Sequence, residues 1–136
     1  MKNFQLTSFT KAIITGLLLA FLTYIFFYTL EDEKVVELLT VIMTLIGAAY
    51  YGFAFKEDNR SIVITEVVVS TLFIVTALLG LWFSIWFIFA GLVLHGFWDL
   101  IHHNSKKLAT IPSWYIPFCV VYDWVLAVIV LFVILL

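Results

Sequence analysis

Long apolar runs separated by short polar segments dominate the pattern along this chain. A helix needs about 20 mostly apolar residues to cross a hydrocarbon core of about 30 Å, and most of the runs match that length. The run that begins at Ser61 is about twice as long, so it must turn, and we expect the turn within the segment from Gly80 to Ser84. The pattern therefore predicts an all-α bundle of five transmembrane helices, at about 12–30, 35–55, 61–80, 83–103 and 117–136.

The composition of the chain is typical of a membrane protein. Hydrophobic residues make up 65% of the 136 residues, charged residues only 12%, and the mean hydropathy is +1.17. Soluble domains contain about twice that share of charged residues. Five crossings occupy nearly the whole length, so we expect a single transmembrane domain over 1–136 and no soluble domain. The first run ends without a small-residue cleavage pattern, which favours a retained helix over a signal peptide.

The basic residues are distributed unevenly between the two ends of the predicted bundle. With five helices, six of the seven Lys and Arg residues lie on one side of the membrane: Lys2, Lys11, Lys56, Arg60, Lys106 and Lys107. Only Lys34 lies on the other side. Because cytoplasmic loops carry such an excess, we expect a cytoplasmic N-terminus, an outer C-terminus and a bacterial inner membrane. The basic residues form no stripe, which argues against nucleic-acid binding.

The most informative segment is the one from His95 to His103, which contains all three histidines of the chain. At about 100° per residue, four of its titratable side chains fall on one face of a helix: His95, Asp99, His102 and His103. Two more carboxylates, Glu66 and Asp123, lie in other predicted spans at a similar depth near the cytoplasmic side. The sequence therefore predicts a polar layer inside the bundle.

This layer has the chemistry of a metal site. An ionised side chain inside a bilayer costs at least about 2.5 to 3.5 kcal/mol, so a cation, a histidine partner or a proton must compensate each carboxylate. Imidazole together with carboxylate suits a divalent metal, and we expect zinc rather than iron. The expected ligands are His95, Asp99, His102 or His103, and Asp123. Asp123 or Glu66 is the candidate general base.

Each of these residues also has a purely structural interpretation. His102 and His103 stand at a helix end, where histidine favours the helix dipole and the headgroup layer. His95 could be hydrogen-bonded within the bundle, and Glu66 could extend toward the interface. Cys119, the only cysteine, lies one turn before Asp123, and we interpret it as a small buried residue.

Three classes of function fit this pattern. In the first, a metal ion activates water that attacks a lipid-like substrate entering from the leaflet. In the second, the same groups carry metal ions or protons across the membrane, with a homo-oligomer supplying the path. In the third, the chain is a noncatalytic subunit of a larger membrane complex.

Two family resemblances accompany the motif. The block from His95 to His103, followed by Ile111 to Asp123, resembles small bacterial multi-helix membrane proteins of unknown function. This resemblance covers about the last 45 residues and implies no activity. The chain is more loosely similar to membrane hydrolases of the alkaline ceramidase type, which hold zinc with histidines and an aspartate. Those proteins have more helices and a His-x-x-x-His motif that this sequence lacks.

Overall fold

The computed structural model describes residues 7–136 and confirms an all-α chain with five helices in this part. The helices are α1 (Ser8–Phe27), α2 (Asp32–Ala54), α3 (Arg60–Trp82), α4 (Trp86–His102) and α5 (Tyr115–Leu135). Four of them, α1, α2, α3 and α5, are long and apolar enough to span a membrane. The remaining helix, α4, is also apolar but shorter. Its 17 residues extend about 26 Å.

Polar residues start several helices earlier than the apolar pattern predicts. The hydroxyl of Thr7 accepts a hydrogen bond from the backbone N–H of Thr10 at 3.2 Å, which caps α1 ahead of residue 12. Asn59 caps α3 in the same way through the N–H of Ser61 at 2.9 Å. Acidic residues in the first turn of α2 favour the positive end of that helix dipole. Hydropathy locates each span, whereas at α1 and α3 a capping hydrogen bond marks where the helix begins.

The turn that the sequence predicts within residues 80–84 lies at the end of that segment in the structure. Helix α3 continues through Gly80 to Trp82, and the connection to α4 runs over residues 83–85. A Cβ at residue 80 would overlap the side chain of Ile88 on α4. Gly80 therefore permits close approach of two helices rather than a reversal of the chain.

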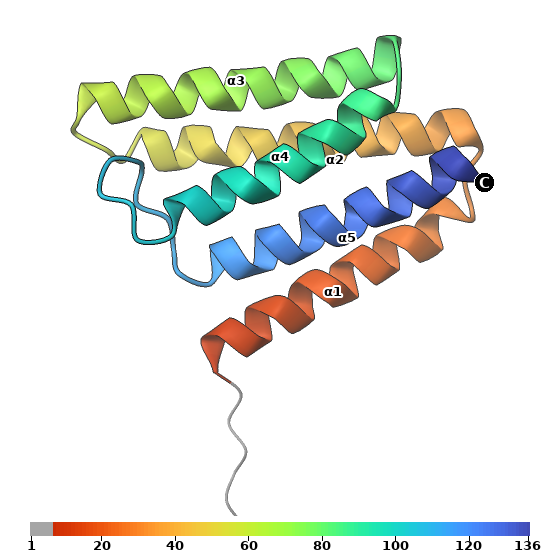
Figure 1. Ribbon diagram of the computed structural model, residues 1–136, viewed down its shortest axis with the longest axis horizontal. Helices are drawn as coiled ribbons and strands as arrows, with labels where there is room; N and C mark the ends of the chain where they lie inside the picture. The colour runs from red at the N-terminus through yellow and green to blue at the C-terminus, as the bar shows by residue number, and fades with distance from the viewer. Residues whose placement is uncertain (1–6) are drawn as a thin grey trace, which may run out of the picture.

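In the bundle α2 packs along α3, α3 on α4 and α4 on α5, each pair antiparallel, whereas α5 packs on α1 in parallel (Figure 1). The start of α1 and the α2–α3 and α4–α5 connections lie at one end, which we call the basic end (Figure 1). Its basic residues are Lys11, Lys56, Arg60, Lys106 and Lys107, and Lys34 belongs to the opposite end. Lys2, the sixth residue of the predicted charge bias, lies outside the described residues. The orientation of the bundle in a membrane stays a prediction.

Apolar and polar side chains occupy different halves of the interior. The half away from the basic end contains a core of aliphatic residues that includes Leu39, Met43, Ile88, Leu126 and Val130. The half toward the basic end contains the buried titratable side chains, because these lie late in α4 and early in α3 and α5. The bundle thus places the predicted polar layer in its interior.

Candidate metal centre

Four potential metal ligands from α4 and α5 converge in the polar half. They are His95, Asp99, Cys119 and Asp123, and one ligand atom of each lies within 4.8 Å of the others. Cys119 is 2% exposed, and the other three side chains are completely buried. No other group of three or more such ligands is found among residues 7–136.

The helix spacing of these residues explains their convergence. His95 and Asp99 are four residues apart on α4, and Cys119 and Asp123 are four residues apart on α5, so each pair lies on one helical face. The two faces meet because α4 and α5 pack together at Gly96, where a Cβ would overlap the indole of Trp124. That indole donates a hydrogen bond to the carbonyl of Val93 at 3.2 Å.

The distances within the cluster are close to those of a tetrahedral metal site. His95 Nδ1 lies 3.4 Å from Asp99 Oδ2, and Cys119 Sγ lies 3.7 Å from Asp123 Oδ2. Zinc bonds of about 2.0 to 2.3 Å place neighbouring tetrahedral ligands about 3.3 to 3.7 Å apart. His95 Nδ1 and Asp123 Oδ2, hydrogen-bonded at 2.7 Å, would have to separate by about half an ångström. The widest separations, up to 4.8 Å, would have to close by about 1 Å. With side-chain shifts of this size the four residues could hold a divalent ion.

Aromatic residues from α2 and α3 enclose the cluster. The hydroxyl of Tyr50 donates a hydrogen bond to Asp99 Oδ1, and its ring packs edge-on against His95 with centroids 5.4 Å apart. Phe73 covers the same imidazole at 4.7 Å. Tyr50, a ligand-orienting residue that the sequence pattern did not single out, is 1% exposed. The sequence gives one sign of this role, because the Tyr50 hydroxyl lies at the depth predicted for the polar layer.

The cluster retains unused hydrogen-bonding capacity. His95 Nε2, Asp99 Oδ2 and Asp123 Oδ1 are buried and have no hydrogen-bond partner. Two carboxylates share one imidazole, so protonating that ring cannot balance both negative charges. A divalent cation would balance both, and coordination of a metal is one of the ways in which buried carboxylates are compensated.

Glu66 and His102 form a second buried unit that is separate from the cluster. Glu66 Oε1 contacts His102 Nε2 at 2.7 Å and accepts a hydrogen bond from the N–H of Ala109 at 2.9 Å. His102 Nδ1 donates to the carbonyl of Trp98 at 2.8 Å. Both ring nitrogens are therefore in use. The unit joins α3, α4 and the α4–α5 connection, whose Thr110 N–H also donates to Glu57 Oε1 at 2.6 Å.

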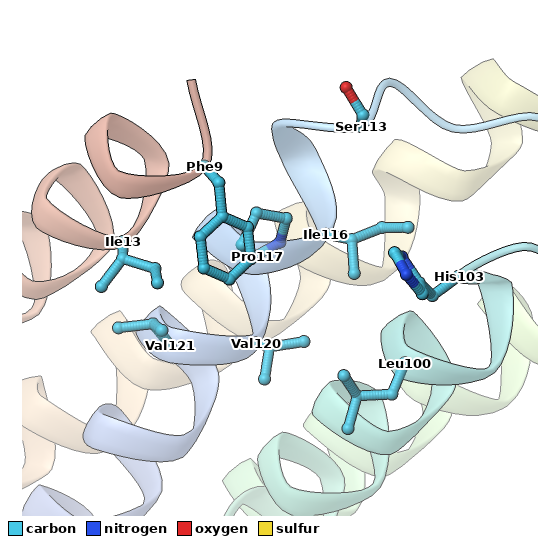
Figure 2. A pocket seen from close by; sticks show the side chains of 9 residues that line it. All are labelled: Phe9, Ile13, Leu100, His103, Ser113, Ile116, Pro117, Val120 and Val121. Carbon is cyan, nitrogen blue, oxygen red and sulfur yellow. The ribbon is translucent and has the colours of Figure 1, made fainter. Parts of the chain in front are cut away.

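The third histidine lies outside both units. Figure 2 shows His103 beside Leu100 and Ile116, along an apolar groove that α1, α4 and α5 line. A helical wheel places His95, His102 and His103 on one broad face, but it omits the rise along the axis. Seven residues carry His102 about 10 Å toward the basic end, and one more residue turns His103 away by about 100°. Of the predicted ligands, the structure brings together His95, Asp99 and Asp123, with Cys119 as the fourth.

The comparisons with known proteins bear on nearly the whole chain. Residues 11–134 match the model of the family of unknown function DUF6010, a range that includes both buried units. Neither the curated proteins nor the solved structures give a match. With its apolar helices and its buried cluster of potential metal ligands, the chain belongs to the DUF6010 family.

Proposed function

We propose that this membrane protein binds one divalent metal ion, zinc in preference to iron, through His95, Asp99, Cys119 and Asp123. The observation that carries the proposal is the convergence of four buried ligand atoms within 4.8 Å. Zinc binds imidazole, thiolate and carboxylate ligands in proteins. Ions that prefer oxygen ligands, such as calcium and magnesium, would need neither the imidazole nor the thiolate. The uneven basic residues support a cytoplasmic basic end in a bacterial inner membrane.

We infer that the ion serves hydrolysis of a lipid-like substrate. A groove of about 260 Å³ beside Cys119 and Tyr122 is lined otherwise by apolar residues of α1 and α2 and by aromatic residues of α5. An acyl chain in this groove would lie beside one ligand of the centre. A divalent ion supplies a Lewis acid that activates water, and Asp123 Oδ1, which has no partner, is the candidate base. The other predicted base, Glu66, is hydrogen-bonded to His102 and Ala109.

The metal proposal is tested by elemental analysis of the protein purified in detergent. We expect one zinc per chain, a sharp loss of zinc in His95→Gln, and full occupancy in the matched control His103→Gln. A four-ligand site that loses an inner ligand retains little affinity. Wild-type protein that contains no metal and takes up no zinc on dialysis would reject the proposal.

A second experiment separates hydrolysis from transport. The zinc-loaded protein is incubated with phosphatidylglycerol and phosphatidylethanolamine vesicles, and released fatty acid is measured. Asp123→Asn keeps an oxygen ligand but removes the base, so turnover should fall much more than zinc content. Zinc flux in proteoliposomes without lipid cleavage would favour the carrier instead. Absence of both activities, with a protein partner that copurifies, would favour the noncatalytic subunit.

A further inference from the structure

Three contacts fix how α3 and α4 face each other. Glu66 contacts His102, Phe73 packs on His95, and Gly80 lies against Ile88. Each step of seven residues along α3 is matched by a step of seven back along α4, as two antiparallel helices require. In this register Ser70, one turn after Glu66, lies at the level of Trp98.

The facing sides of these two helices contain four buried polar atoms without a partner. They are Glu66 Oε2, Ser70 Oγ, Trp98 Nε1 and His95 Nε2. Glu66 and His95 are completely buried and Ser70 is 1% exposed. A buried polar group left without a hydrogen bond costs about 1–3 kcal/mol, and ordered water is the usual partner where no protein group is available.

The spacing of these atoms along the helices suits single water molecules. Glu66 and Ser70 are one turn apart, which is about 6 Å along the axis. Two hydrogen bonds through one water span about 5.5 Å. His95 and Trp98 are separated by about 4.5 Å along α4. Measured along the helix axes, each of these separations is close to the span of one bridging water.

We propose that ordered water lies between α3 and α4 and joins His95 Nε2, through Ser70, to Glu66. The consequence for zinc rests on the proposed function. A histidine that binds an ion through Nδ1 has its proton on Nε2, and metal-bound histidines almost always donate that N–H to a carboxylate, a carbonyl or water. Ser70 and Glu66 are then positioning residues, and the two buried units are connected.

The proposal is tested by ¹⁵N NMR of histidine-labelled protein in micelles, with and without zinc, using His95→Gln for assignment. Ser70→Ala should shift the Nε2 resonance of His95 in both states and weaken zinc binding about 10- to 100-fold. Ser70→Thr retains the hydroxyl and should restore the resonance. Thr65→Val removes a hydroxyl that bonds to the Ser61 carbonyl of the same helix, and it should change neither property.

The spectra of the zinc-free protein test the water connection independently of the metal centre. A His95 Nε2 resonance that Ser70→Ala leaves unchanged overturns the water connection, whatever the zinc affinity. A shifted resonance in a protein that takes up no zinc supports the water connection and rejects the metal centre. A shift in Ser70→Thr as large as the shift in Ser70→Ala would also overturn the role of the hydroxyl.

Discussion

His95 and His102 lie two turns apart on α4, and each contacts a carboxylate from a neighbouring helix at 2.7 Å. Around His102 the hydrogen bonding of the imidazole is complete, because one nitrogen contacts Glu66 and the other the Trp98 carbonyl. Around His95 two carboxylates and a thiol converge, and Nε2 has no protein partner. The first arrangement holds helices together, whereas the second has capacity for a ligand. Burial and charge alone therefore do not distinguish a structural histidine from a metal ligand.

The largest effect on stability is expected at the His102 unit. Glu66→Leu leaves His102 and the Ala109 N–H buried without their partner, and loss of one member of a buried pair costs about 3–5 kcal/mol. Unfolding in mixed SDS micelles measures this free energy. The double variant Glu66→Leu/His102→Phe should recover most of the loss. A stability close to wild type in Glu66→Leu alone would contradict the structural role of the pair.

Zinc should stabilise the protein through the His95 unit only. At a free zinc concentration of about 100 times Kd, a ligand that binds only the folded state adds about 2.7 kcal/mol to the free energy of unfolding. We expect this gain in wild type and in His102→Gln, and no gain in His95→Gln. Equal gains in the two variants would remove the proposed difference between the histidines.

A smaller change is expected at Tyr50, which lies between the two units. Tyr50→Phe removes a hydrogen bond to the Asp99 carboxylate, for which we expect a loss of about 1.5–3 kcal/mol in the zinc-free protein. Bound zinc would compensate Asp99 directly, so the loss should shrink when zinc is present. Unfolding measured in both states checks this, and an equal loss in both would place Asp99 outside the metal site.

The smallest effect is expected at an ion pair that water reaches. Lys34 Nζ contacts Glu37 Oε2 at 2.9 Å, and more than half of each side chain is exposed. Solvent and salt screen such pairs. Lys34→Ala should therefore leave the unfolding midpoint unchanged. A measurable loss would show that ion pairs at this end contribute to stability even without burial.

The number of helices and the depth of the polar layer could be predicted, because hydropathy and helical periodicity are local properties. The partners of each histidine could not, since they depend on the register between helices. Cys119 joins the cluster because α4 and α5 approach at Gly96, and His102 lies with Glu66 because α3 and α4 pair in a fixed register. The turn lies at the end of the expected segment 80–84 and not at Gly80 itself, for a related reason. A glycine permits both a turn and close packing, and only the neighbouring helix decides between them.

The pairing of α1 with α5 has a consequence for how the protein is made. α1 is synthesised before the other described helices, but it packs on the last of them, where Thr23 and Tyr122 are hydrogen-bonded at 3.1 Å. Until α5 has been made, this face of α1 lacks its main packing partner. Arrival of α5 supplies the missing partner of α1 and, through Cys119 and Asp123, two of the four ligands. A metal centre made by these four residues can therefore form only after α5, the same helix that completes the packing of α1, has joined α4.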